Sequence, residues 1–528
     1  MTQAAKLIGK VRQGVQSVAY GNPLYQRILS SGDVPLQLHF TPSDLWPGDA
    51  HAGEALLASQ ETMFFLAEDS SLRNAAITLR NLRAVGSDAA RRMCIRLIDG
   101  WMQQFDHWDK DEWTPKNLGA RLAAWIGFYD FYSPAGDAAF IERLVASIHR
   151  QWNHLARITS TSLKGVEAIE AARGLLYGGL NFPNGDKAMG LACALIQRQL
   201  ASELLSDGGH ISRNPSVQFR LLRGLVDIRH VLEQAEIRLP PSIGTGLTAL
   251  ISPLKVLRHG DGGLALFNGA IEETPLAIDA VLTQAVVRGR VLRRLPEMGY
   301  ERMIAGRSLL LVDAGAPPPL AFGHDGHAGL LSFEFSVGRE RLIVNCGASP
   351  NSLPEWRTAC AATAAHSTLT IDDTNACSLN ADDGIVGQVV TSAQRFEENG
   401  DQTVEMAHNG YFSRFGITHS RTLRLSSDGD TLSGRDLLQG SKRHTFTLRW
   451  HVHPKVQASL SQDGKTVLLR TAAGSGWRLR LDQGRLSLES SVYCGQGIPR
   501  RTVHVKASGV THPGDTVVRW NLSHERKN

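Results

Sequence analysis

The hydrophobic periodicity of the chain changes near its middle, and this change limits the possible folds more than any single motif does. In the first half, apolar residues recur at i, i+3, i+4 and i+7, the spacing of an amphipathic helix face. The segments with this pattern are 88–105, 118–132, 138–158, 166–180 and 187–205. From about Leu264 the period becomes two, which is typical of half-buried strands. The pattern predicts a helical part followed by many antiparallel strands that form a large sandwich.

Short breaks separate the helical segments. Ser87 before Asp88 fits an N-cap, and the stretches 134–136 and 183–185, which contain Pro and Gly, are expected loops. Antiparallel helix pairs joined by such loops fit an incomplete (α/α) toroid. By pattern alone they fit another helical array equally well.

The length of the chain predicts more than one domain. A chain of 528 residues is too long for one hydrophobic core and suggests two to four domains of roughly 100–250 residues each. The seam between the helical part and the strand part falls near residues 253–263. We therefore expect a helical domain over residues 1–262 and a sandwich domain over residues 263–528. Ligand sites favour seams of this kind.

Composition excludes several classes of function. With 42% hydrophobic and 20% charged residues, the chain has the composition of an ordinary soluble globular protein. Its net charge of +5 permits an anionic partner, and no Lys/Arg-rich run indicates nucleic acid or a membrane surface. The six cysteines form no C-x-x-C motif. No run approaches the roughly 20 apolar residues of a membrane span.

The stretch from Gly323 to Ile371 concentrates residues suited to chemistry. Two short apolar runs, 331–336 and 341–345, are joined by a glycine turn, and residues 367–371 alternate as a third strand. Imidazole groups, which titrate near neutral pH, serve in acid-base catalysis and in metal binding. Three histidines lie at the entrances of these strands: His324, His327 and His366.

The order and spacing of residues in this stretch resemble the central sheet of the heparinase II/III-like polysaccharide lyases. The matching positions are His327, Ala328, Ser332, Phe333, Val344, Gly347, Trp356, Thr363, Ala365, His366 and Thr368. In the helical half, the segments 46–50 and 207–211 also resemble the family. The resemblance implies an α+β multidomain protein with an N-terminal incomplete (α/α) toroid, a C-terminal antiparallel β-sandwich and a cleft between them.

The resemblance further implies a lyase that cleaves a uronate-containing glycan by β-elimination, so the expected partner is an anionic poly- or oligosaccharide. This reaction needs a group that neutralises the C6 carboxylate, a base for the neighbouring proton and an acid for the leaving oxygen. His327 matches the family's catalytic histidine and is the expected base. The acid is left open among Tyr177, Tyr300 and His324.

The carboxylate-binding group is expected in the segment 207–215. Arg213 can bind a carboxylate through two parallel hydrogen bonds. Asn214 and His210 lie close to it in sequence, and His210 is also a candidate catalytic group. Asn214 before Pro215 equally matches a helix N-cap followed by proline at the first helical position, and both interpretations stay open. The further candidate substrate ligands are His324 and His366.

Several positions depart from the family pattern. Val217 stands where relatives carry the acid-base tyrosine, and residues 165–167 stand where relatives carry an asparagine near the uronate carboxylate. Gly329 and Asn345 replace the two aspartates of the family's zinc site, which leaves only His366 of the three ligands. We therefore expect no zinc and no other cofactor.

A second histidine pair lies further along the chain. His451 and His453 flank Val452, so both side chains are expected on one face of a strand. This spacing is compatible with a metal pair. Because no third ligand accompanies them, we interpret them as polar residues on an exposed sheet face.

Two other functions remain open. A glycoside hydrolase on the same scaffold would need two carboxyl groups about 5–9.5 Å apart, and Glu167, Asp207 and Asp261 are the acids to test. A glycan-binding protein without catalysis would also explain the missing tyrosine, asparagine and aspartates. The presence of His327 and of the segment around His210 favours an active enzyme.

The N-terminal residues predict the compartment. Residues 13–22 lack the apolar core of roughly 7–15 residues that a signal peptide needs. The sequence therefore predicts a cytoplasmic protein. A periplasmic location is the alternative, because large acidic polysaccharides are usually met outside the cytoplasm.

Overall fold

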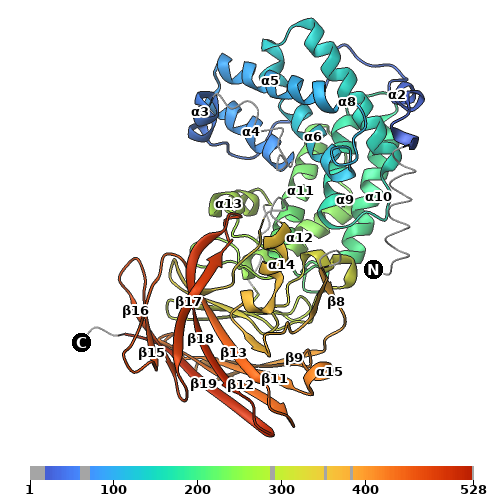
Figure 1. Ribbon diagram of the computed structural model, residues 1–528. Helices are drawn as coiled ribbons and strands as arrows, with labels where there is room; N and C mark the ends of the chain where they lie inside the picture. The colour runs from blue at the N-terminus through green and yellow to red at the C-terminus, as the bar shows by residue number, and fades with distance from the viewer. Residues whose placement is uncertain (1–17, 60–71, 286–291, 350–353, 381–383, 526–528) are drawn as a thin grey trace. The chain divides into compact units, whose positions relative to one another are not determined.

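The structure, a computed structural model, describes residues 18–59, 72–285, 292–349, 354–380 and 384–525. Along these residues, helices dominate up to residue 284 and strands dominate from residue 294 onward. Figure 1 shows the change as helices coloured mainly blue to green and strands coloured mainly yellow to red. The expected order of a helical part followed by antiparallel sheets is confirmed. Residues 13–17 of the segment judged for an export signal lie outside the described residues.

The chain divides into two compact units, and the division runs through helices. The first unit comprises residues 1–203, 220–248 and 280–286, and the second comprises residues 204–219, 249–279 and 287–528. The segment around His210 therefore belongs to the same unit as the strands. Two domains with a boundary between residues 262 and 263 stay a prediction. None of the described helices has both the length and the apolar character that a bilayer span requires.

Four of the five predicted helical segments are observed within two residues of their predicted ends. The fifth, 118–132, is interrupted at Phe128, whose backbone leaves the helical region with φ −110° and ψ 7°. The helices are α2 (Pro23–Leu29), α3 (Ala50–Ala58), α4 (Leu72–Val85), α5 (Asp88–Phe105), α6 (Pro115–Gly127), α7 (Tyr129–Tyr132), α8 (Ala138–Ile158), α9 (Gly165–Gly179), α10 (Gly185–Glu203), α11 (Pro215–Gln234), α12 (Pro241–Val256), α13 (Pro275–Gln284), α14 (Pro354–Ala361) and α15 (Phe412–Phe415).

Helix α8 shows how local sequence defines these elements. The side chain of Asp137 accepts a hydrogen bond from the backbone N–H of Phe140 at 2.7 Å and so satisfies a donor that the first helical turn leaves free. The helix then buries Leu144, Ile148 and Leu155, which are spaced by four and seven residues. Because this spacing places them on one face, α8 packs an apolar stripe into the core of the helical unit.

Helices α6 and α9 approach each other at two glycines. A Cβ atom built on Gly174 of α9 would lie 2.6 Å from the Cα atom of Gly119 in α6. A Cβ atom built on Gly119 would overlap the carbonyl oxygen of Glu170. The two backbones are therefore in direct contact, and α9 also packs against α10.

The strands form two large antiparallel sheets and one hairpin. The first sheet has the order β1-β2-β3-β4-β5-β13-β18-β17 with β6 beside β13, and the second has the order β14-β15-β16-β19-β12-β11-β10-β9. The hairpin pairs β7 with β8. The bounds are β1 (Arg294–Leu295), β2 (Tyr300–Ala305), β3 (Ser308–Asp313), β4 (Phe333–Val337), β5 (Glu340–Val344), β6 (Leu369–Ile371), β7 (Ser378–Asn380), β8 (Gly384–Val386), β9 (Thr391–Glu398), β10 (Asp401–His408), β11 (Thr418–Leu425), β12 (Thr431–Gly440), β13 (Thr445–Val452), β14 (Gln457–Leu460), β15 (Thr466–Arg470), β16 (Gly476–Leu481), β17 (Leu486–Tyr493), β18 (Arg500–Val510) and β19 (Gly514–His524).

The start of the strand part is later than the sequence predicts. Leu264 forms an isolated bridge with Arg258, α13 follows from Pro275, and the first strand begins at Arg294. Residues 264–267 are all buried. A short continuous apolar run does not distinguish a strand from a buried connecting segment, and this ambiguity explains the error.

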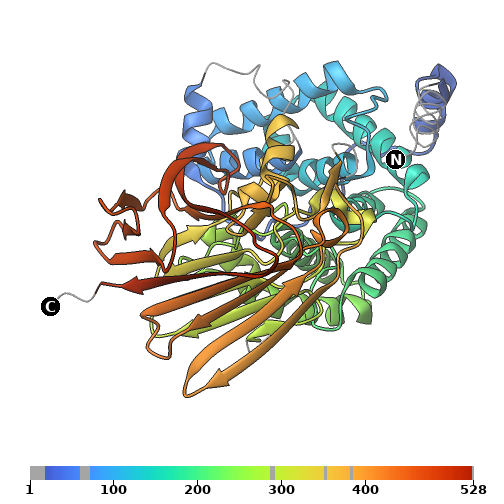
Figure 2. The ribbon, with the colours of Figure 1, turned by 60° about the horizontal axis from the view of Figure 1, so that its bottom comes forward.

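Side chains from both sheets meet in one hydrophobic core. Phe333 of β4 stacks on Trp520 of β19 with ring centroids 5.5 Å apart, and Trp450 of β13 meets Trp520 nearly at right angles at 5.4 Å. Because β4 and β13 belong to the first sheet and β19 to the second, these contacts join the two layers. The strands run side by side in both ribbon views (Figures 1 and 2). The strand part is therefore an antiparallel sandwich.

The glycine contact between α6 and α9 generates a stability prediction. We expect Gly119→Ala to lower the free energy of unfolding by at least about 2 kcal/mol, because the added methyl group forces two packed helices apart. Gly190→Ala in α10 is the matched control, since a Cβ atom there meets nothing within 4 Å and alanine raises helix propensity by up to about 1 kcal/mol. Urea unfolding followed by circular dichroism measures both variants. Equal stability of the two variants would contradict the packing described here.

Candidate functional site

His327 and His366 form a buried pair in the second unit. His327 follows the 3-10 helix Leu320–Asp325, and His366 follows the 3-10 helix Thr363–Ala365 shortly before β6. Nδ1 of His327 lies 3.2 Å from Nε2 of His366, and the ring centroids are 5.2 Å apart. His327 is 7% exposed and His366 is 1% exposed. Both rings are buried, and His327 is slightly the more exposed of the two.

Hydrogen-bond partners decide which nitrogen of each ring carries hydrogen. Nδ1 of His366 lies 2.8 Å from the carbonyl oxygen of Ala362, which can only accept, so this nitrogen is protonated. In a neutral ring, Nε2 of His366 then accepts, and Nδ1 of His327 must donate to it. Nε2 of His327 is left with a free lone pair. This is the form of imidazole that a general base requires.

Burial keeps both rings neutral. Loss of solvent is the main cause that lowers the pKa of His327 well below its usual value, and the nearby His366 and Arg357 lower it further. Loss of solvent also lowers the pKa of His366, to about 4. At neutral pH the pair is therefore uncharged, and the lone pair on Nε2 of His327 is unprotonated.

The side chain of Asn268 connects this pair to the segment around Arg213. Its Oδ1 accepts a hydrogen bond from the backbone N–H of His327 at 3.1 Å. Its Nδ2 donates to the carbonyl oxygen of Arg213 at 3.1 Å and to the hydroxyl of Tyr300 at 2.7 Å. The Tyr300 hydroxyl in turn donates to the carbonyl oxygen of Arg213 at 2.5 Å. Three residues selected from the sequence, His327, Arg213 and Tyr300, therefore share one hydrogen-bonded set.

The guanidinium of Arg213 already has partners within the protein. Nε donates to the carbonyl oxygen of Met298 at 2.7 Å, and Nη1 donates to that of Ala316. Nη2 pairs with the buried carboxylate of Asp313. Arg213 is 5% exposed. A substrate carboxylate would have to compete with these groups, and the role of Arg213 as a substrate ligand stays a prediction.

Asn214 caps helix α11, as its structural interpretation predicts. Its Oδ1 accepts a hydrogen bond from the backbone N–H of Ser216 at 2.9 Å, and Pro215 is the first helical residue. His210 is fully buried, with Nδ1 2.8 Å from Oγ of Ser212 and its ring edge-on to Phe322. Catalytic or substrate-binding roles for His210 and Asn214 stay predictions.

The two remaining acid candidates differ in exposure. His324 is exposed, and Arg357 donates a hydrogen bond to its Nδ1, so Nε2 carries the hydrogen of the neutral ring. Tyr177 lies in the first unit, where burial, with a smaller contribution from Asp227, raises its pKa. Burial also raises the pKa of Tyr300. A raised pKa makes a phenol a weaker proton donor.

A cavity of about 370 Å³ lies beside Arg213 and Tyr300 in the second unit. Its walls include Arg294, Glu297 and Glu301, together with residues 314–319 and 391–393. The volume is in the range of small-molecule sites. The histidine pair does not line this cavity, so the two features are separate.

The residues at the expected zinc position do not fit a zinc ion. A Cβ atom on Gly329 would lie 2.5 Å from Cδ2 of His366, so the imidazole occupies the space into which an aspartate would extend. Asn345 offers a neutral amide whose Oδ1 already accepts from the backbone N–H of Ser367 at 2.9 Å. Within the described ranges, no three His, Cys, Asp or Glu side chains are placed to hold a metal ion. The absence of zinc stays a prediction from these contacts.

His451 is buried, which corrects the expectation of an exposed pair on the sheet. Its Nε2 lies 3.0 Å from the carbonyl oxygen of Ala364, and its Nδ1 lies 2.8 Å from Oγ of Ser491. His453 follows the end of β13, with Nε2 3.9 Å from the carboxylate of Glu272. Strand β13 lies inside the first sheet, and this explains why His451 is covered.

Two of the three acids considered for hydrolysis, Asp261 and Asp207, have structural partners. Burial raises the pKa of Asp261, but the paired guanidinium of Arg341 outweighs it, with a resulting pKa of about 2. Asp207 accepts hydrogen bonds from three backbone N–H groups. Glu167 lies in the first unit, and burial raises its pKa. A carboxyl group that is ionised above pH 2, as in Asp261, does not serve as a general acid.

Comparison with known proteins agrees with this fold. A family profile described as heparinase II/III-like, C-terminal, matches residues 287–521. FtsZ-localized protein C of Caulobacter vibrioides (strain NA1000 / CB15N) is 30% identical over 475 residues, which cover 84% of this chain and 80% of that protein. Heparinase III superposes with a TM-score of 0.67 at 13% identity, covering 94% of this chain and 79% of that chain. Heparan sulfate lyase HepC from Pedobacter heparinus superposes with a TM-score of 0.60 at 14% identity, covering 98% of this chain and 91% of that chain.

These findings define first a fold and then a family. A helical part followed by an antiparallel sandwich is the heparinase III fold, and the likeness to the two lyase structures concerns this fold. The chain belongs to the heparinase II/III-like family. Both histidines of the pair lie in the stretch Gly323–Ile371, in which the sequence resembles that family.

Sequence reasoning missed two residues that hold the site together. Asn268 lies next to Gly269, a pattern that indicates only a turn. Glu334 lies between Phe333 and Phe335, and all three are buried in β4. An acidic residue inside an aromatic strand is a usable signal, because a buried carboxylate requires dedicated hydrogen-bond donors.

The neutral histidine pair generates a prediction of acid sensitivity. A histidine in the unfolded chain has a pKa of about 6.5, and that of His366 in the folded state is about 4. The unfolded state therefore binds the proton first. The contribution of His366 to the free energy of unfolding is complete above pH 6.5 and is lost as the pH falls. Below pH 4 the free energy of unfolding is lower by on the order of 3 kcal/mol. Urea midpoints between pH 7 and pH 4 measure the decline.

Two variants separate His366 from the other titrating groups. We expect His366→Gln to make the decline of stability with falling pH less steep. Substitution of the exposed His512 by Gln should leave the slope unchanged. Identical slopes for wild type and His366→Gln would contradict the buried neutral state of this ring.

Proposed function

We propose that this protein is a polysaccharide lyase that cleaves a uronate-containing glycan by β-elimination. The observation that carries the proposal is the tautomer of the histidine pair, in which Nε2 of His327 has a free lone pair at neutral pH. The heparinase III fold supports the same reaction class. In this proposal His366 does not touch the glycan, since it is 1% exposed, and it positions His327 instead.

His327 is the proposed base that removes the proton next to the uronate carboxylate. Donation from Nδ1 of His327 to His366 fixes the ring orientation, so Nε2 meets the proton in a defined direction. The acid for the leaving oxygen stays open among His324, Tyr177 and Tyr300: His324 is exposed, whereas the hydroxyl of Tyr300 already donates to the carbonyl oxygen of Arg213. Neutralisation of the carboxylate remains assigned to Arg213, assisted by His210 and Asn214.

The proposed substrate is an anionic poly- or oligosaccharide. Heparinase III and heparan sulfate lyase, which share the fold, are named for such glycans. The net charge of +5 is compatible with an anionic chain.

Activity on a panel of uronate-containing glycans tests the proposal. We expect the ultraviolet absorbance of the unsaturated uronate product to rise with wild type. We expect His327→Ala to reduce the rate by about 10²–10⁴-fold, the usual contribution of a general base. His512→Ala, at an exposed histidine, is the matched control and should retain the wild-type rate. Release of reducing ends without the absorbance rise would indicate a hydrolase instead, and no product on the whole panel would contradict both activities.

A second candidate function is a non-catalytic role in which the protein associates with FtsZ. The observation in its favour is the 30% identity to FtsZ-localized protein C, which extends over 84% of this chain. The guanidinium of Arg213 and the hydroxyl of Tyr300, which would serve catalysis, both bind groups of the protein itself. In this case the heparinase III-like scaffold would act through binding alone.

Co-sedimentation with polymerised FtsZ tests this second candidate. We expect the purified chain to pellet with the polymer if it shares this property with its relative, and to stay in the supernatant without polymer. His327→Ala should pellet to the same extent, because the base has no part in binding. A protein that cleaves glycans and does not pellet would exclude the second candidate.

A further inference from the structure

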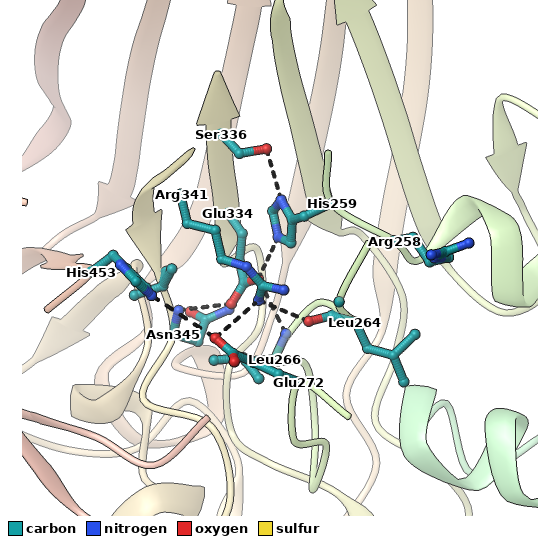
Figure 3. A network of polar contacts seen from close by, with 12 residues as sticks. Arg258, His259, Leu264, Leu266, Glu272, Glu334, Ser336, Arg341, Asn345 and His453 are labelled. Atoms are coloured by element: carbon teal, nitrogen blue, oxygen red, sulfur yellow. Dashed lines mark hydrogen bonds and ion pairs between the residues drawn. The ribbon is translucent and has the colours of Figure 1, made fainter. Parts of the chain in front are cut away.

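A buried carboxylate contacts both chain segments that lead to the histidine pair and has no part in the proposed chemistry. Glu334 of β4 is 0% exposed, and its two oxygens accept three hydrogen bonds (Figure 3). Oε1 accepts from the backbone N–H of Asn345 at 2.8 Å. Oε2 accepts from the backbone N–H of Leu266 at 3.1 Å and from Nε2 of His259 at 2.8 Å. Because β4 is buried along most of its length, these donors are the source of the carboxylate's stabilisation.

The first of these bonds leads to His366. Asn345 directly follows β5, and its Oδ1 accepts a hydrogen bond from the backbone N–H of Ser367 at 2.9 Å. Oγ of Ser367 donates to the carbonyl oxygen of Val344 at 2.7 Å. The residue directly after His366 is therefore tied to the end of β5. Glu334 holds that end in place through Asn345.

The second bond leads to His327. Leu266 lies two residues before Asn268 in the buried segment that precedes α13. Oδ1 of Asn268 accepts the backbone N–H of His327 at 3.1 Å. Glu334 therefore anchors the chain segment that positions His327 as well as the one that positions His366. The two segments are distant in sequence and meet at this carboxylate.

The third donor keeps the carboxylate itself in one orientation. Nδ1 of His259 lies 2.9 Å from Oγ of Ser336, and its Nε2 points at Glu334 (Figure 3). Both ring nitrogens are thus engaged, and the imidazole is 3% exposed. Arg341, which lies in the same view, binds Asp261 and the carbonyl oxygen of Leu264. This contact secures the segment that contains Leu266 from a second side.

We propose that Glu334 is the positioning residue of the histidine pair. Its carboxylate binds the two segments that carry His327 and His366, and so sets the contact between Nδ1 of one ring and Nε2 of the other. The effect of Glu334 on catalysis rests on the proposed function. Its effect on the position of the two rings rests on the hydrogen bonds alone. In Glu334→Gln, the side-chain NH₂ group faces the backbone N–H of either Leu266 or Asn345. That N–H then has no acceptor, and its segment is released.

Histidine side-chain NMR tests the structural consequence without requiring activity. With ¹⁵N-labelled histidine, and with His327→Ala and His366→Ala to assign the signals, we expect both rings of the wild type to be protonated at Nδ1. In Glu334→Gln we expect the nitrogen signals of both rings to shift. Glu405→Gln removes an exposed carboxylate of β10 that has no hydrogen bond to any described residue, and it should leave both signals unchanged. Unchanged signals in folded Glu334→Gln would overturn the proposal.

Two further variants keep the test valid if Glu334→Gln does not fold. Asn345→Ala releases the segment of His366, and Asn268→Ala releases that of His327. We expect each to shift the signal of its own histidine more than the other. Unchanged signals in both variants would also overturn the proposal.

Kinetics tests the catalytic consequence. We expect Glu334→Gln to lower kcat by roughly 10- to 100-fold with KM within about twofold, because the carboxylate does not touch substrate. Loss of substrate affinity with kcat unchanged would contradict a positioning role. If the wild type shows no lyase activity while the histidine signals still respond to Glu334→Gln, the proposed function fails and the positioning role stands.

Discussion

A carboxylate buried in a sheet is tolerated only if hydrogen-bond donors surround it, and the candidate site depends on this requirement. Glu334 obtains its donors from Leu266, Asn345 and His259. Two of these are backbone N–H groups, so satisfying the carboxylate also determines the course of two chain segments. Those segments hold the backbone of His327 and of His366. The cost of burying one charge is thereby linked to the position of both rings.

The same region shows which groups fill the positions where the family resemblance implies aspartates. With Gly329 in place of an aspartate, the ring of His366 lies directly against the backbone. With Asn345 in place of the second aspartate, a neutral side chain supports the neighbouring turn at Ser367. At the first position the imidazole of His366 fills the space, and at the second a neutral amide oxygen accepts a backbone hydrogen bond. The pocket that a cation would need is filled by an imidazole whose other nitrogen faces Ala362.

Periodicity predicted the elements well, because an amphipathic helix or strand is encoded within its own segment. α5 and α8 have the predicted bounds. The error at Leu264 arose where a segment is buried on all sides and has no polar face to reveal its conformation. For the candidate site, the position of His327 followed from its motif and the capping role of Asn214 from Pro215 after it. The partners of Arg213 could not be predicted, since Asp313, Met298 and Ala316 are about 100 residues away.

The sequence by itself determined the order of helical and strand parts, the family resemblance and the residue types available for chemistry. These properties reside in local spacing and in side-chain identity. Only the tertiary structure decided that His366 supports His327, that the guanidinium of Arg213 is used within the protein, and that Glu334 and Asn268 hold the site. Each of these is a contact between segments distant in the chain. Such contacts depend on burial and on the competition among donors for a limited number of acceptors, which no local pattern records.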